Sequence, residues 1–274
     1  MTDQTPLQKW HEVVRSRNPA LLNQSLDVLR QRHAALRTTI SVLDGAPVQR
    51  LRPFCATELP MADIEAVPRE QRVQRALAMA RALRNQQFEL EGGPLFRCQL
   101  IRLDSNEFLL AVVIHHIVCD GWSMEILQRE LLGLYRQFAA GLPVNRVPAA
   151  VQFHDYVAMA AQNQQDTQHA NRRQLEWWRQ QLADLDPILY LPGNAEQPDH
   201  LSTQAAHRHF TVASALVRPL EQRASASGAT LYMLLASALG ILLHRYTRQA
   251  RFCLGTVSAN RQGAALQQVV GFLA

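Results

Sequence analysis

Residues Ala111–Ser123 read AVVIHHIVCDGWS, and this stretch decides how the whole chain is interpreted. Two adjacent histidines, His115 and His116, end an apolar run, and an Asp-Gly pair follows at a spacing of four from the second histidine. Phe108–Val118 is rich in branched apolar residues and contains no Gly or Pro, which predicts a buried strand. Because successive side chains on a strand point to opposite faces, we expect only one of the two histidines to face a cavity.

The residues after the histidines predict a tight turn and then a helix. Asp120-Gly121 is a turn signal, and Ser123 is a suitable N-cap for the helix that follows. Apolar residues then recur at helical spacing until Gly141 and Pro143, which are expected to end the helix. The stretch is therefore interpreted as strand, turn and helix, with a histidine where the strand ends.

Three roles for the histidines are open at this point. One is a buried structural histidine whose ring is satisfied by a neighbour. Metal ligation is a weaker interpretation, because adjacent histidines on a strand diverge and no other His, Cys or carboxylate pair falls at ligand spacing. The third role is an imidazole that acts as a general base on an alcohol, an amine or a thiol.

Length and composition exclude several classes of protein. A chain of 274 residues that is 47% apolar can bury a sizeable core. Its net charge of +5 comes mostly from dispersed arginines without a nucleic-acid motif, so we expect no nucleic-acid partner. The polar N-terminus is unlike a signal peptide, and Leu231–Leu243 is shorter than the roughly 20 residues that span a bilayer. We therefore expect a cytoplasmic protein without membrane contact and with reduced cysteines.

The rest of the chain predicts alternating helices and strands, and hence an α/β protein. Helices are expected at Pro19–Ala35, Pro68–Gln87, Ser214–Ser227 and Thr230–Tyr246, the last of them buried because it is apolar nearly all round. Strands are expected at Arg37–Val42, Val48–Phe54, Leu95–Leu103, His207–Val212 and Arg251–Ser258. The polar stretch Gln162–His169 predicts a boundary between an N-terminal lobe, residues 1–166, and a second lobe, residues 167–274.

The string from His115 to Ser123 resembles the HHxxxDG motif of the condensation domains of non-ribosomal peptide synthetases. Further stretches resemble motifs of the same family, in the family's order: Arg32–Thr39 (RHExLRT), Phe88–Arg97 (FDLxxGPLxR), Phe153–Val157 (YxDYA), Gly255–Arg261 (GxxxAxR) and Val270–Ala274 (the start of GxFxNT). The resemblance covers almost the whole chain from about Pro19 onward. The family's first motif, SxAQxRLW, and everything after the start of GxFxNT are not found.

The resemblance implies a chloramphenicol-acetyltransferase-like two-lobed fold whose second lobe is incomplete, and a fragment that is inactive alone. It implies amide formation between an acyl or peptidyl donor and an aminoacyl acceptor. Both would ride on 4'-phosphopantetheine arms of carrier protein domains upstream and downstream, next to an adenylation domain. The domain itself would bind no cofactor and no metal.

The resemblance also assigns roles to residues. His116 would be the catalytic histidine, while His115 points away, and Gly121 would leave room for the acceptor arm. Asp120 would be structural, ion-paired to Arg32 or Arg37, because a desolvated carboxylate needs a cation or several donors. Two other functions stay open: a free-standing acyltransferase that uses coenzyme A or a carrier, and a truncated remnant without catalysis.

Overall fold

The computed structural model describes residues 18–166, 168–186, 188–192 and 210–274. The chain forms two compact units, one with the described residues up to Asp166 together with Ser258–Ala274, and one with the described residues of Gln168–Val257. The last stretch of the chain thus belongs with the first unit, although the sequence interpretation placed it with the second lobe. The assignment of lobes to residues 1–166 and 167–274 stays a prediction.

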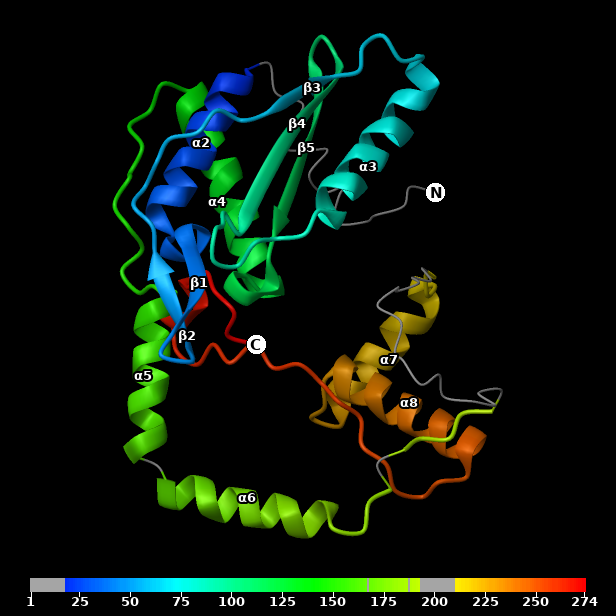
Figure 1. The fold of residues 1–274 in the computed structure, drawn as a ribbon. Helices are drawn as coiled ribbons and strands as arrows, with labels where there is room; N and C mark the ends of the chain where they lie inside the picture. Colours follow the sequence, from blue (N-terminus) through cyan, green and yellow to red (C-terminus); the bar gives the residue numbers. More distant parts are fainter. Residues whose placement is uncertain (1–17, 167, 187, 193–209) are drawn as a thin grey trace. The chain divides into compact units, whose positions relative to one another are not determined.

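A layered α/β structure forms most of the first unit (Figure 1). Strand β3 (Met61–Asp63) runs parallel to β4 (Phe96–Asp104), and β4 pairs with β5 (Glu107–Ile114) in an antiparallel hairpin. Helix α3 (Arg69–Asn85) packs on one face of this sheet. Helices α2 (Pro19–Arg32) and α4 (Gly121–Ala139) pack on the other face and against each other.

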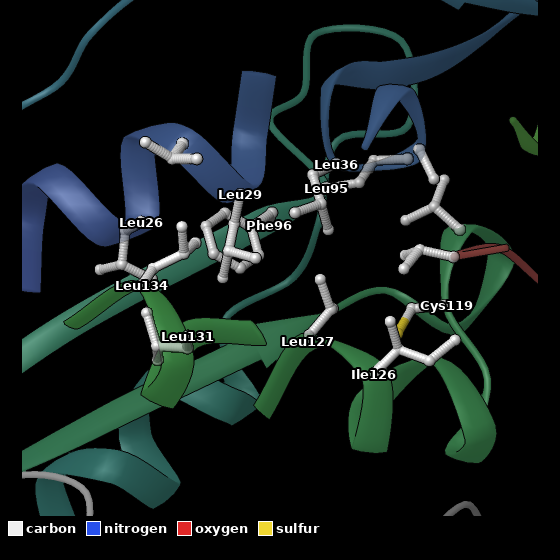
Figure 2. Close-up of a cluster of buried hydrophobic side chains, with 14 of the residues drawn as sticks. Leu26, Leu29, Leu36, Leu95, Phe96, Cys119, Ile126, Leu127, Leu131 and Leu134 are labelled. Carbon is white, nitrogen blue, oxygen red and sulfur yellow. The ribbon is translucent and has the colours of Figure 1, made fainter. Parts of the chain in front are cut away.

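Alternation along the strands supplies both faces with apolar side chains. In β4, Leu100 joins the core beneath α2 and α4, while its neighbour Ile101 joins the core beneath α3. Figure 2 shows the first of these cores, in which leucines of α2 and α4 meet Leu95 and Phe96. Burial of each such side chain contributes about 1.5–3 kcal/mol, so this core rigidly holds the end of β5 and the start of α4.

Short elements complete the first unit. A 3-10 turn, η1 (Ala34–Arg37), follows α2, which ends the predicted helix three residues early. Strands β1 (Thr38–Leu43) and β2 (Ala46–Leu51) form a hairpin whose turn, Asp44-Gly45, has positive φ at both residues, so the expected turn is confirmed. Helix α5 (Phe153–Asp166) ends the continuous part of the unit.

Helices make up the second unit: α6 (Gln168–Leu182), α7 (Ser214–Ala226) and α8 (Leu231–Thr247). The strand predicted at Arg251–Ser258 is wrong: a strand needs a partner, and the described residues of this unit form no strand with which it could pair. Of the strand predicted at His207–Val212, residues 207–209 lie outside the described residues. Residues 210–212 form no strand.

The expected burial of α8 is also wrong. None of its side chains is buried, because α7 covers only part of a surface that is apolar on every side. Among the described residues, no single helix has the length and apolar content to cross a membrane, and α7 and α8 reach that limit only as a pair bent by 104°.

Candidate active site

The two histidines lie where β5 ends and a 3-10 turn, η2 (His116–Val118), begins. The backbone N–H of His115 still donates to the Leu95 carbonyl at 2.9 Å, so the ladder to β4 continues to this residue. The strand predicted to reach Val118 therefore ends at Ile114, because the chain turns into η2 after the last hydrogen bond to the neighbouring strand. The turn, rather than strand alternation alone, separates the two side chains.

His115 is held on the protein side. Its Nδ1 accepts a hydrogen bond from the Ile117 backbone N–H at 3.1 Å, and its ring meets the ring of Phe88 edge-on at 5.7 Å. Because Nδ1 is an acceptor here, the proton of a neutral ring is on Nε2. This lone pair is occupied, which makes His115 a poor candidate for proton transfer.

His116 is exposed, and its ring meets the ring of Phe272 edge-on, with centroids 5.0 Å apart and planes at 90°. Among the described residues, its imidazole has no hydrogen-bond partner. A neutral imidazole with free nitrogens can accept a proton from a ligand and later donate it. The geometry therefore favours His116 over His115 as an acid-base group.

Asp120 caps α4 and is buried, with 2% of its side chain exposed. Its Oδ1 accepts from the backbone N–H and the hydroxyl of Ser123, at 2.8 and 2.7 Å, and its Oδ2 accepts from the Leu273 N–H at 3.2 Å. Asp120, rather than Ser123 as predicted, is thus the N-cap.

The cation paired with Asp120 is Arg261. Its Nη1 lies 2.7 Å from Oδ2 and its Nη2 lies 3.0 Å from Oδ1, a bidentate pair in which 2% of each side chain is exposed. Burial opposes ionisation of Asp120, but the hydrogen bonds from Arg261 and Ser123 outweigh it and hold the pKa of Asp120 below its ordinary value. The prediction of Arg32 or Arg37 as the partner is therefore wrong.

Arg32 and Arg37 are used elsewhere. Arg32 lies 3.5 Å from the carboxylate of Glu130, which His33 also contacts at 3.0 Å. Burial opposes the charge on Glu130, yet the contacts from His33 and Arg32 keep its pKa below the ordinary value. Arg37 donates to the backbone carbonyl of Arg30 at 2.7 Å. Arg32 thus pairs with a carboxylate of α4, and Arg37 donates to the backbone of α2 and to the Arg52 carbonyl, while Asp120 pairs with Arg261.

The segment that supplies Arg261 lies along the start of α4. The Trp122 indole N–H donates to the Gln267 carbonyl at 3.0 Å, and the Gly271 N–H donates to the Ser123 hydroxyl at 3.0 Å. Gly271 is packed so closely that a Cβ there would lie 2.3 Å from Cδ2 of Phe153. This segment is distant in sequence from the HHxxxDG motif. In the sequence, only the resemblances to GxxxAxR and GxFxNT indicated that the segment contributes to the site.

Two further residues of the motif differ in their surroundings. A Cβ at Gly121, the first residue of α4, would meet no atom within 4 Å, so space is open there. Cys119 is buried, and this burial, together with the negative charge of Asp120, raises the pKa of its thiol to about 12. Cys119 is therefore a packing residue rather than a nucleophile.

A cavity of about 570 Å³ lies elsewhere in the first unit, between α2, β4 and the loop after β2. The described residues that line it include no histidine, and the guanidiniums of Arg37, Arg52 and Arg97 at its wall donate to backbone carbonyls. These arginines hold loops together, so we place the site at His116. Among the described residues, no group of three or more His, Cys, Asp or Glu side chains is positioned to hold a metal ion.

Comparison with known proteins gives consistent results. The family model for the Condensation domain matches residues 8–273. Chondramide synthase cmdD of Chondromyces crocatus is 34% identical over 251 residues, which cover 92% of this chain and 6% of the synthase. Phosphinothricin tripeptide synthetase PhsC of Streptomyces viridochromogenes is 30% identical over 253 residues, which cover 92% of this chain and 23% of the synthetase. The chain thus spans only a small part of these relatives.

Solved structures show the same architecture. The first condensation domain of the calcium-dependent antibiotic synthetase, in complex with a substrate analogue, superposes with a TM-score of 0.74 at 22% identity. The match covers 93% of this chain and 59% of that structure. This likeness confirms the predicted α/β, chloramphenicol-acetyltransferase-like fold class.

Proposed function

Because this chain belongs to the condensation-domain family, we propose that it forms an amide bond between two thioesters held on carrier proteins. The amine of an aminoacyl thioester attacks the carbonyl carbon of the acyl or peptidyl thioester. A C–N bond forms, the C–S bond breaks, and the proton lost by the amine ends on the departing thiolate. The reaction therefore needs no metal, oxidant or cofactor beyond the phosphopantetheine arms of the carriers.

His116 is the residue proposed to handle that proton. The carrying observation is its position: an exposed imidazole at the end of β5, without a hydrogen bond to any residue that the structure describes. It can orient the amine, accept its proton as a general base, and return the proton to the thiolate. Gly121 lies close by in sequence, at the start of α4, and its open surroundings support a path for the acceptor arm.

Asp120 is proposed to act on structure alone. Both carboxylate oxygens are occupied by Arg261, and each also accepts a bond from Ser123 or Leu273. A carboxylate so fully bonded and held ionised by its neighbours has no lone pair to offer a substrate. Its contribution is to fix the start of α4 relative to the C-terminal segment.

Carrier protein domains upstream and downstream, and an adjacent adenylation domain, are the proposed partners. Support comes from the relatives, which are synthetases many times longer than this chain. A cytoplasmic location is part of the same proposal.

The test is a condensation assay in the full-length context, because the 274 residues alone are expected to be inactive, with one carrier loaded with an acyl donor and the other with an aminoacyl acceptor. We expect His116→Ala to lower the rate about 10²–10⁴-fold, the usual contribution of a general acid-base group. His115→Ala is the matched control, because its lone pair already accepts a bond from Ile117. Far-ultraviolet circular dichroism of both variants checks that the fold is retained.

The outcomes separate the three functions. Turnover by His116→Ala beside an inactive His115→Ala would reverse the assignment of the catalytic histidine. Turnover of a coenzyme A thioester with a small amine or alcohol, but not of carrier-bound substrates, would favour the free-standing acyltransferase. Absence of turnover with either kind of substrate would favour the non-catalytic remnant.

A further inference from the structure

We infer that Phe272 is a positioning residue for His116, and that the motif aspartate acts on the histidine through it. This inference rests on the proposed function, in which His116 handles the proton of the amine. Asp120 lies four residues from His116, yet no hydrogen bond joins the two side chains in the described part of the chain.

The contact between the two rings is the first observation. Aromatic pairs are favourable with centroids 4.5–7 Å apart and an edge-to-face arrangement. His116 and Phe272 meet at 5.0 Å and 90°, well inside this range. Since the imidazole of His116 has no hydrogen-bond partner among the described residues, we infer that this ring contact restricts its rotation.

The second observation is how Phe272 itself is held. The Gly271 N–H donates to the Ser123 hydroxyl at 3.0 Å, and the Leu273 N–H donates to Oδ2 of Asp120 at 3.2 Å. The backbone is thus pinned on both sides of Phe272, while 43% of Phe272 stays exposed. A large apolar side chain held half in solvent by its neighbours is placed for its ring contact rather than for its own burial.

These contacts form a continuous path. Asp120 holds the Leu273 amide, the two pinned residues hold Phe272, and the ring of Phe272 meets His116. The buried ion pair with Arg261 keeps Asp120 charged and in place. The path explains how a carboxylate that touches no substrate can affect the geometry of the acid-base group.

The neighbouring histidine provides a comparison within the same molecule. His115 also meets a phenylalanine edge-on, Phe88 at 5.7 Å and 86°. His115 has in addition a hydrogen bond from the Ile117 N–H, so its orientation does not depend on the phenylalanine alone. Loss of Phe88 should therefore change the ring current at His115 but not its rotamer, whereas loss of Phe272 should release His116.

The first test uses nuclear magnetic resonance of the chain with labelled histidine rings, and His116→Gln identifies the His116 signals. In Phe272→Leu, which keeps an apolar side chain without a ring, we expect the His116 signals to move toward those of an exposed histidine. Phe88→Leu should leave the His116 signals in place, and Phe272→Tyr should restore them. His116 signals that do not respond to Phe272→Leu, or that respond equally to Phe88→Leu, would overturn the inference.

The second test is kinetic, with loaded carriers as substrates. Phe272→Leu should lower kcat about 2- to 10-fold, the range that corresponds to one aromatic contact, with KM for both carriers unchanged. Phe272→Tyr should recover kcat. A rise in KM alone would show that Phe272 only shapes the substrate path, and an unchanged kcat would refute the positioning role. Because the resonance test needs no turnover, failure of the condensation assay would count against the proposed function only.

Discussion

Replacing Arg261 by methionine should loosen the first unit while leaving the second unit unchanged. Methionine keeps the unbranched apolar stem of the side chain but ends before the guanidinium, the group that binds both oxygens of Asp120. The same guanidinium donates to the Val269 carbonyl at 3.1 Å and to the Ala259 carbonyl at 3.2 Å. The substitution therefore strands a buried carboxylate and leaves two carbonyls with one donor fewer.

The size of the effect follows from these contacts. Removing one partner of a buried ion pair costs about 3–5 kcal/mol, because the remaining charge is stranded. Asp120 would keep its bonds from Ser123 and from the Leu273 N–H, which favours the lower end of this range. We expect a loss of about 3 kcal/mol, and since each 1.4 kcal/mol is a factor of ten, a local opening about 100-fold more frequent.

Hydrogen exchange followed by mass spectrometry measures this opening segment by segment. Peptides from the start of α4 and from residues 258–273 should exchange about 100-fold faster in the variant, the factor that 3 kcal/mol implies. Peptides from α7 and α8 belong to the other unit and serve as the internal control. Arg32→Met is the matched variant, because its contact with Glu130 is partly exposed and its loss should cost under about 1 kcal/mol.

The dependence on pH gives a second check. The pKa of Asp120 is lowered in the folded protein, so its charged form adds stability above the ordinary value of 3.8 and loses it as the pH falls through the lowered value. The difference in stability between the parent chain and Arg261→Met should thus have its full size at neutral pH and become smaller below pH 3.8. Equal exchange in both units, or a larger effect of Arg32→Met, would refute the reasoning.

Three further substitutions or reactions test the surroundings of the site. In Gly121→Ala the added Cβ meets no protein atom within 4 Å, so the substitution should slow condensation without lowering the melting temperature. Gly133→Ala, equally unobstructed within α4, is the control. It should add up to about 1 kcal/mol of stability and leave the rate unchanged. Gly271→Ala places a Cβ 2.3 Å from Phe153 and should lower the stability by about 1–3 kcal/mol in urea, with partial recovery in combination with Phe153→Ala. Cys119, whose thiol pKa is raised by burial to about 12, should stay unmodified by iodoacetamide at about pH 8 in peptide mapping, and rapid labelling would contradict its burial.

Much of the first unit could be predicted from patterns local in sequence. The apolar periods of α2, α3 and α4 and the hairpin of β4 and β5 each depend on a short window of residues, and the structure confirms them to within a few residues at the ends. The ends of these elements differ from the prediction where a hydrogen bond determines them. Asp120 rather than Ser123 caps α4, because its carboxylate reaches the N–H of Ser123.

The second unit was harder to predict because its elements depend on partners. Alternation at Arg251–Ser258 indicates a strand only if another strand pairs with it, and the described residues around it form none. In the same way, an apolar helix such as α8 is buried only as far as other elements cover it. A sequence pattern indicates which face of a segment can be buried. It does not show whether another helix or strand is present to cover that face.

The partner of Asp120 shows why a site cannot be completed from its motif alone. A desolvated carboxylate does need a cation or several donors, and Asp120 has both, but the motif that contains Arg32 and Arg37 does not supply the cation. The true partner, Arg261, lies 141 residues away in sequence. It lies in the one stretch that returns to the first unit after the second, and no local period records that return. The resemblance to GxxxAxR included this arginine but did not identify its partner. The fold shows that the same returning segment also brings Phe272 to His116. The ion pair and the ring contact therefore both depend on the packing of this one segment against the first unit.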